Sequence, residues 1–162
     1  SLSRQSNTIF IMVLSGAQAK AVQKNWANVK AHAQKYGNDL FVQYLTQNPG
    51  DIQIFAKFRD ANLGDLRSNA EFNKQTKTVI DALSKIVDNL GDLNAGCSFL
   101  RERVRTHHPR GISMAQFERL LDLMPMFLQE QAGADGVVAD AWRILVADLM
   151  PEMRDEFTKC SQ

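Results

Sequence analysis

The sequence has few cysteines and no long apolar run. Its 162 residues include two cysteines, Cys97 and Cys160, and no Cys-x-x-Cys pair. Two thiols cannot build a disulfide framework, and no zinc site is indicated without paired cysteines. We therefore expect free thiols in a reducing compartment, which favours a cytoplasmic location. The longest apolar run, residues 9–14, is far shorter than the roughly 18 residues that a membrane-spanning helix needs.

The charge lacks a dominant sign. Nineteen Lys+Arg against eighteen Asp+Glu give a net charge of +1, so neither nucleic acid nor an anionic membrane is indicated as a partner. Apolar residues make up 44% and charged residues 23% of the chain, which is typical of a globular protein rather than of disorder. The length fits one domain. We interpret residues 1–13 as an N-terminal extension of open role and residues 14–162 as the domain.

The familiar catalytic motifs are missing as well. The chain has no His-Glu-x-x-His zinc motif, no Ser-His-Asp signature, no glycine-rich phosphate loop and no paired-carboxylate motif. Nucleophilic catalysis and phosphate chemistry therefore have no support from the sequence. We expect a protein that is not an enzyme in its main role, with a secondary redox activity left open.

Apolar residues at helical spacing are frequent in the sequence. Strict two-residue alternation is absent, and the pattern predicts an all-α chain with Ser15 as the N-cap of its first helix. Pro125 and Pro151 lie inside helical patterns and predict kinks or breaks, while glycines such as Gly37 are turn signals. Apolar residues recur at three- and four-residue steps over residues 22–33, 72–90, 117–128 and 142–153.

Two adjacent histidines are the first candidate for chemistry. A single axial imidazole can hold a haem iron between apolar walls. Neighbouring residues on a helix diverge, so only one of His107 and His108 could be such a ligand, and both share a stripe with Val104. Periodicity does not choose between them. The alternative is a surface pair that ends a helix before Pro109, where cations interact favourably with the helix dipole.

Two further features have both a structural and a functional explanation. Gln75 lies on the apolar stripe of residues 72–90, either as a polar residue at the edge of the stripe or as a donor aimed at something inside. Phe55 and Phe58 follow Pro49 in a connecting segment. They either fill the core or clamp a flat apolar cofactor.

Taken in order, these features resemble the globin family. The resemblance runs from Leu14 to about Phe157 and is greatest to invertebrate single-domain haemoglobins and myoglobins. It implies the globin fold, with about eight helices around a haem pocket. The residues that carry it are Ser15 with Trp26, Asn48-Pro49 with Phe55 and Phe58, Gln75 with Val79, the stretch 106–113 (Thr-His-His-Pro-Arg-Gly-Ile-Ser), Phe117, and Ala141-Trp142.

The resemblance implies haem b held by one axial histidine. Counting back from Ile112 by the invertebrate pattern selects His107 as the iron ligand. Arg103 then stands where globins usually place an apolar residue, whereas a choice of His108 would put Val104 there. By the same resemblance, the second ring nitrogen of the ligand donates to a backbone carbonyl about one turn earlier.

The resemblance also assigns the remaining positions of the pocket. Gln75 takes the distal position, where most globins have histidine, and its amide can donate a hydrogen bond to a bound ligand. Lys57 and Arg110 correspond to basic residues that meet the haem propionates, with plain solvation as the alternative. The other cofactor-binding positions are Phe41, Phe55, Phe58, Thr78, Val79 and Phe117.

The function that the resemblance implies is reversible binding of dioxygen for transport or storage, with carbon monoxide and nitric oxide as further ligands. A nitric-oxide dioxygenase, a peroxidase-like activity, sulfide binding and a haem-free regulatory module are the alternatives. Peroxidase chemistry needs a distal acid-base group, which Gln75 does not supply. The resemblance also leaves room for a homodimer.

Overall fold

The computed structural model describes residues 14–107 and 111–161, and these residues form helices and connecting segments without a strand. The predicted all-α fold is confirmed. Within this part of the chain the helices follow one another as α1 (Gly16–Ala31), α2 (Ala33–Gln47), η1 (Pro49–Ile54), η2 (Leu63–Ser68), α3 (Ala70–Asp88), α4 (Leu93–His107), α5 (Met114–Gln131) and α6 (Gly136–Cys160), where η marks a 3₁₀ helix.

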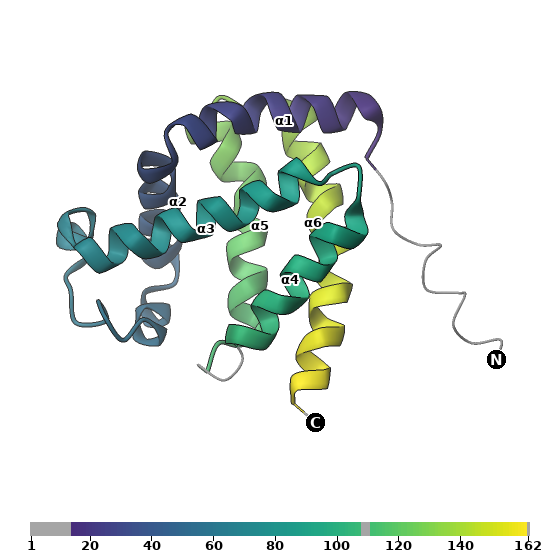
Figure 1. Cartoon of the computed structure of the whole chain (residues 1–162). Helices are drawn as coiled ribbons and strands as arrows, with labels where there is room; N and C mark the ends of the chain where they lie inside the picture. Colours follow the sequence, from purple (N-terminus) through teal and green to yellow (C-terminus); the bar gives the residue numbers. More distant parts are fainter. Residues whose placement is uncertain (1–13, 108–110, 162) are drawn as a thin grey trace.

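The helices pack in two crossing layers. Helix α1 lies across the ends of α5 and α6, which run side by side, and α3 and α4 lie in front of that pair (Figure 1). Helix α2 connects α1 to the 3₁₀ segments and packs against α3. The apolar stripes predicted from the sequence face the space between these layers, where Trp26 and Trp142 are buried with their ring centroids 5.5 Å apart.

The first helix begins as predicted. The Ser15 side chain accepts from the Gln18 backbone N–H at 3.1 Å, and the Gln18 side chain accepts in return from the Ser15 N–H at 2.9 Å. This capping box satisfies two backbone donors that a helix start leaves without partners. Within the stripe of residues 22–33, however, α1 ends at Ala31 and α2 begins at Ala33.

The interpretation of Gly37 as a turn signal was wrong. Gly37 is buried inside α2, where the helix crosses α3 closely. A Cβ at this position would lie 2.8 Å from the backbone oxygen of Thr76. Only a residue without a side chain allows the two backbones to come this close. The glycine therefore serves helix packing and not chain reversal.

The two prolines do not end their helices. Pro125 lies inside α5 and Pro151 inside α6, and both helices continue beyond them. The predicted breaks are therefore absent. In the described part of the chain, no helix combines the length and apolar character that crossing a membrane requires. The predicted N-terminal extension, residues 1–13, lies outside the described residues.

Candidate functional site

The candidate site is an apolar slot between α3, α4 and the first half of α5. It consists of two cavities of about 100 and 90 Å³. The first extends towards α4 and α6, and the second extends towards α2 and η1. The cavities adjoin, since five residues line both of them: Gln75, Val79, His107, Phe117 and Leu120.

His107 lies at the last residue of α4 and lines both cavities. Its Nδ1 is 2.7 Å from the backbone oxygen of Arg103, one turn earlier. A ring nitrogen that faces a carbonyl carries a proton, so in the neutral form of this ring the lone pair is on Nε2. The ring also makes an edge contact with Phe117, at a centroid distance of 6.0 Å. His108, the alternative ligand, lies outside the described residues, and Val104 is fully buried in the core.

Gln75 faces the slot from the side of α3. It is half-buried and lines both inner cavities, and it also lines an open groove of about 720 Å³ on the outside of the molecule. Gln75 therefore lies where the groove meets the slot. Within the described ranges, its amide has no hydrogen-bond partner. Gln75, which the resemblance assigns to the distal position, thus has its amide at the boundary of the slot.

Aromatic rings form the wall towards α2 and η1. Phe41 is buried and Phe55 half-buried, and both line the second cavity, with ring centroids 6.0 Å apart. Phe58 stacks on Phe55 at 5.0 Å and meets Phe72 edge-on at 5.5 Å. Phe58 lines the outer groove rather than the two inner cavities. Phe58 thus packs against Phe55 on the side of the outer groove and does not face the slot.

The polar residues predicted for the rim lie in the outer groove. Thr78 is exposed, lines the groove and the first cavity, and donates a hydrogen bond to the backbone oxygen of Lys74 at 2.8 Å. Lys57 lines the groove and forms an ion pair with Glu71 at 3.4 Å, with its side chain 69% exposed. Arg110, the other predicted partner of the propionates, lies outside the described residues.

The structure adds a cationic cluster at the α4 side of the slot that the sequence did not reveal. The Arg103 guanidinium lies 5.0 Å from the ring centroid of Phe99, and the Lys85 ammonium lies 4.8 Å from the same centroid. Arg103 and Phe99 line the first cavity. Aromatic faces attract cations at such distances. Arg103 stands where globins usually have an apolar residue. The Phe99 ring allows a charged group here, because it holds the guanidinium at the edge of the slot.

A polar cluster at the α2 side of the slot was also missed. Asp51 accepts hydrogen bonds from the Tyr44 hydroxyl at 2.5 Å, from Arg119 at 2.9 Å and from Gln116 at 3.4 Å. Burial acts to raise the pKa of Asp51, but these donors outweigh burial and hold the pKa below its ordinary value. Burial and the neighbouring carboxylate raise the pKa of Tyr44. Tyr44 and Gln116 line the second cavity.

The side chains that line the slot are chemically suited to a flat apolar group that carries its own metal. In the part of the chain that the structure describes, no three His, Cys, Asp or Glu side chains converge to hold a bare ion. His107 is a single nitrogen donor among apolar and aromatic neighbours. One imidazole suffices where the other ligands come from a porphyrin. The residues present therefore fit a haem better than they fit a free metal ion.

Comparisons with known proteins show similarity to globins. The family model for globins matches residues 38–153. A globin of Nerita albicilla is 27% identical over 80% of this chain and 83% of its own length. A myoglobin of Scomber japonicus is 27% identical over 85% of this chain and 92% of its own length.

A solved structure supports the fold independently. The hexa-coordinate haemoglobin of Drosophila melanogaster, described as binding cyanide, superposes with a TM-score of 0.80 at 21% identity, over 87% of this chain and 94% of that one. The family model covers well over half of the chain and includes both Gln75 and His107. The chain belongs to the globin family.

Proposed function

We propose that this globin binds haem b in the slot and holds dioxygen reversibly, as a carrier or store. The observation that carries the proposal is that His107 and Gln75, which come from different helices, line the same two apolar cavities. One side chain offers a nitrogen lone pair, and the other offers an amide donor. Family membership supports the same conclusion.

His107 would hold the iron of the haem through its imidazole. Bound haem supplies a ferrous iron that coordinates small gases reversibly. The carbonyl of Arg103 fixes the tautomer and the orientation of the imidazole, so that Nε2 is the donor atom. The edge contact with Phe117 restricts rotation of the ring further. The chain thus presents a preorganised ligand on one side of the slot.

Gln75 would act on the gas ligand. Its amide offers two N–H donors and does not titrate, and it is a poor ligand for iron. A hydrogen bond to a group that gains negative charge contributes about 1.5–3 kcal/mol, which corresponds to roughly a ten- to hundredfold change in affinity. This donor would favour dioxygen over carbon monoxide, because carbon monoxide is much less polar.

The aromatic wall would keep water out of the slot. Phe41, Phe55 and Val79 present apolar surface beside Gln75 in the second cavity. These apolar side chains would exclude water from the place where the haem would be held. At the groove, Lys57 could exchange Glu71 for a propionate at little cost, because exposed ion pairs are weak.

An absorption spectrum of the haem-loaded chain tests the proposal. We expect a five-coordinate, high-spin ferrous form that becomes six-coordinate when dioxygen or carbon monoxide is added. A ferrous form that is six-coordinate without added ligand would show that a side chain fills the distal site. Failure of the purified chain to take up haem would contradict the proposal altogether.

A further inference from the structure

Asp51 lies at a junction of three helices beside the slot. It belongs to η1 and accepts hydrogen bonds from Tyr44 on α2 and from Gln116 and Arg119 on α5. Arg119 binds both carboxylate oxygens, with Nη2 at 3.1 Å from Oδ1 and at 2.9 Å from Oδ2. The Asp51 side chain is only 14% exposed. Charge-assisted contacts of this kind are stronger and more directional than neutral hydrogen bonds.

This cluster connects the two sides of the candidate site. Asp51 lies four residues before Phe55, which forms part of the aromatic wall. Gln116 also accepts from the backbone N–H of Ser113 at 2.8 Å and so caps the start of α5. Ser113 follows His107 by six residues. The Asp51 carboxylate thus ties the segment that leads to Phe55 to the start of α5.

We propose that Asp51 is a positioning residue that sets the separation of the aromatic wall from α5, and thereby how firmly the slot holds its cofactor. The inference rests on the proposed function. Tyr44 and Gln116 are the two side chains that transmit the effect, because each contacts Asp51 and also lines the second cavity. Asp51→Asn keeps one acceptor oxygen but removes the charge and the second oxygen, so position 51 can no longer accept from all three donors at once.

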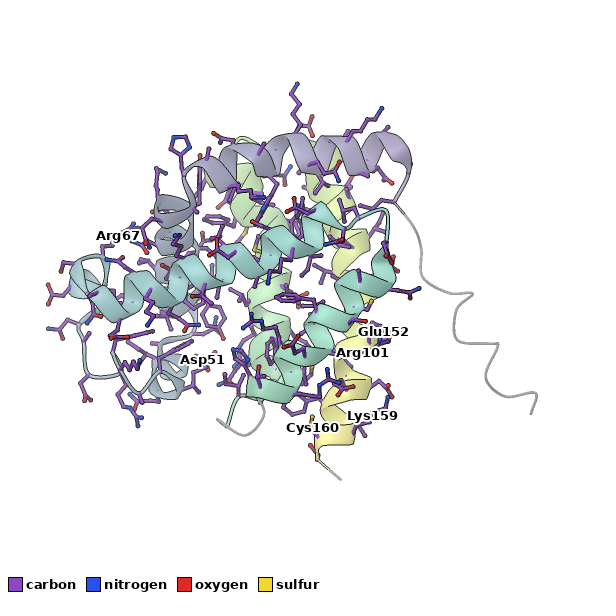
Figure 2. The ribbon with its side chains drawn as sticks, in the orientation of Figure 1. Asp51, Arg67, Arg101, Glu152, Lys159 and Cys160 are labelled. Carbon is purple, nitrogen blue, oxygen red and sulfur yellow. The ribbon has the colours of Figure 1, made fainter. Side chains whose placement is uncertain are left out.

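A second aspartate provides a matched control. Asp39 on α2 is also 14% exposed, and it pairs with Arg67 at 2.7 Å and with Lys35 at 3.0 Å. Hydrogen bonds from these cations hold its pKa below the ordinary value against the effect of burial, as at Asp51. Asp39 ties α2 to η2 and lines neither cavity of the slot. Figure 2 shows the positions of Asp51 and Arg67.

The test compares Asp51→Asn with Asp39→Asn in the full chain loaded with haemin. The measured quantity is the rate of haemin transfer to an excess of a haem-free acceptor protein. We expect Asp51→Asn to lose haemin about tenfold faster than the parent and Asp39→Asn to stay within about twofold. Tyr44→Phe, which keeps the ring and removes the hydroxyl, should lie between them. Equal rates for the two aspartate variants would overturn the inference.

Measurements without haem separate this inference from the proposed function. Urea unfolding of the haem-free chain should show similar stability losses for the two aspartate variants, so that a difference in haemin loss reports on the slot. Binding of the apolar dye 8-anilinonaphthalene-1-sulfonate to the same chain should weaken severalfold in Asp51→Asn alone. Unchanged dye binding would count against the inference. A parent chain that takes up no haemin would instead contradict the proposed function. In that case, dye binding alone would test whether Asp51 positions the walls of the slot.

Discussion

Two faces of helix α3 differ in whether the polar side chains compared here have hydrogen-bond partners within the protein. On the face packed against α1 and α2, Thr76 is fully buried, donates to Asn38 at 2.6 Å and accepts from Gln34 at 3.0 Å. On the same face, Ser84 accepts from the Trp26 indole at 2.9 Å. On the face towards the slot, the amide of Gln75 has no hydrogen-bond partner within the described ranges.

Under the proposed function, this difference separates the residues of α3 that stabilise the fold from those that contact the ligand. A polar group that the protein itself must satisfy is buried with its partners, since an unpaired buried group costs about 1–3 kcal/mol. Gln75, the proposed donor to a ligand, lies at a cavity without such a partner within the described ranges. Changes on the packed face should therefore alter the free energy of unfolding, and changes on the slot face should alter ligand binding.

The largest expected effect concerns His107, the proposed iron ligand, which lines the same cavities as Gln75 of α3. His107→Gly should weaken haem binding by more than about a hundredfold, because loss of even an outer partner of a metal ligand costs about 10–100-fold. Added imidazole should restore coordination, which haem titration with and without imidazole can measure. His108→Gly is the control and should resemble the parent. A swap of the two phenotypes would identify His108 as the ligand.

The closest contact on the packed face should be the most sensitive to added volume. Gly37→Ala would place a methyl group 2.8 Å from the backbone oxygen of Thr76. We expect a loss of about 1–3 kcal/mol in the free energy of unfolding, measured by urea denaturation. An increase in stability of up to about 1 kcal/mol, as the better helix propensity of alanine alone would give, would show that the two helices do not approach this closely.

Removal of the buried hydroxyl tests the hydrogen-bond network next to Gly37. Thr76→Val keeps the shape of the side chain but leaves Asn38 and Gln34 without one of their partners. We expect a loss of about 1–3 kcal/mol in the free energy of unfolding, with the dioxygen dissociation rate unchanged. If the rate changed as much as it does in variants of Gln75, the separation between the two faces would be wrong.

A smaller effect is expected on the pH dependence of the free energy of unfolding in mild acid. The pKa values of Asp39 and Asp51 lie below the ordinary value of 3.8 in the folded chain. The unfolded chain therefore takes up protons first, so both groups stabilise the fold above about pH 4 and lose that contribution as the pH falls through their folded pKa values. Urea midpoints between pH 5 and 3 should fall less steeply in Asp39→Asn and Asp51→Asn. Slopes equal to that of the parent would contradict these pKa directions.

The sequence predicted the features that depend on local spacing. Helical periodicity located the apolar stripes, and the Ser15 cap follows from residues that are neighbours in the chain. Gly37 was misread because a glycine required by a helix crossing looks the same as a glycine required by a turn. The sequence did not predict that Thr76, next to Gln75, is fully buried. Whether a position on a helix is buried depends on which other helices pack against it, and spacing alone does not give this.

The polar clusters around the slot could not be predicted for a related reason. Arg119 follows Asp51 by 68 residues and Gln116 follows it by 65, and no periodicity connects positions so far apart. Arg103 and Phe99 are four residues apart on α4 and so are neighbours on the helix surface, but the approach of Lys85 from α3 to the same ring does not follow from spacing. In contrast, Gln75 and His107 were identified through the resemblance to globins.

The dioxygen dissociation rate of Gln75→Leu tests the central distinction most directly. Stopped-flow measurement on the haem-loaded chain should show dissociation roughly ten- to hundredfold faster than in the parent, as expected for a lost hydrogen bond of about 1.5–3 kcal/mol. Carbon monoxide affinity and the free energy of unfolding should change little. A dioxygen dissociation rate close to that of the parent would contradict the account, because Gln75 would then not be the donor that the slot face of α3 presents to the ligand.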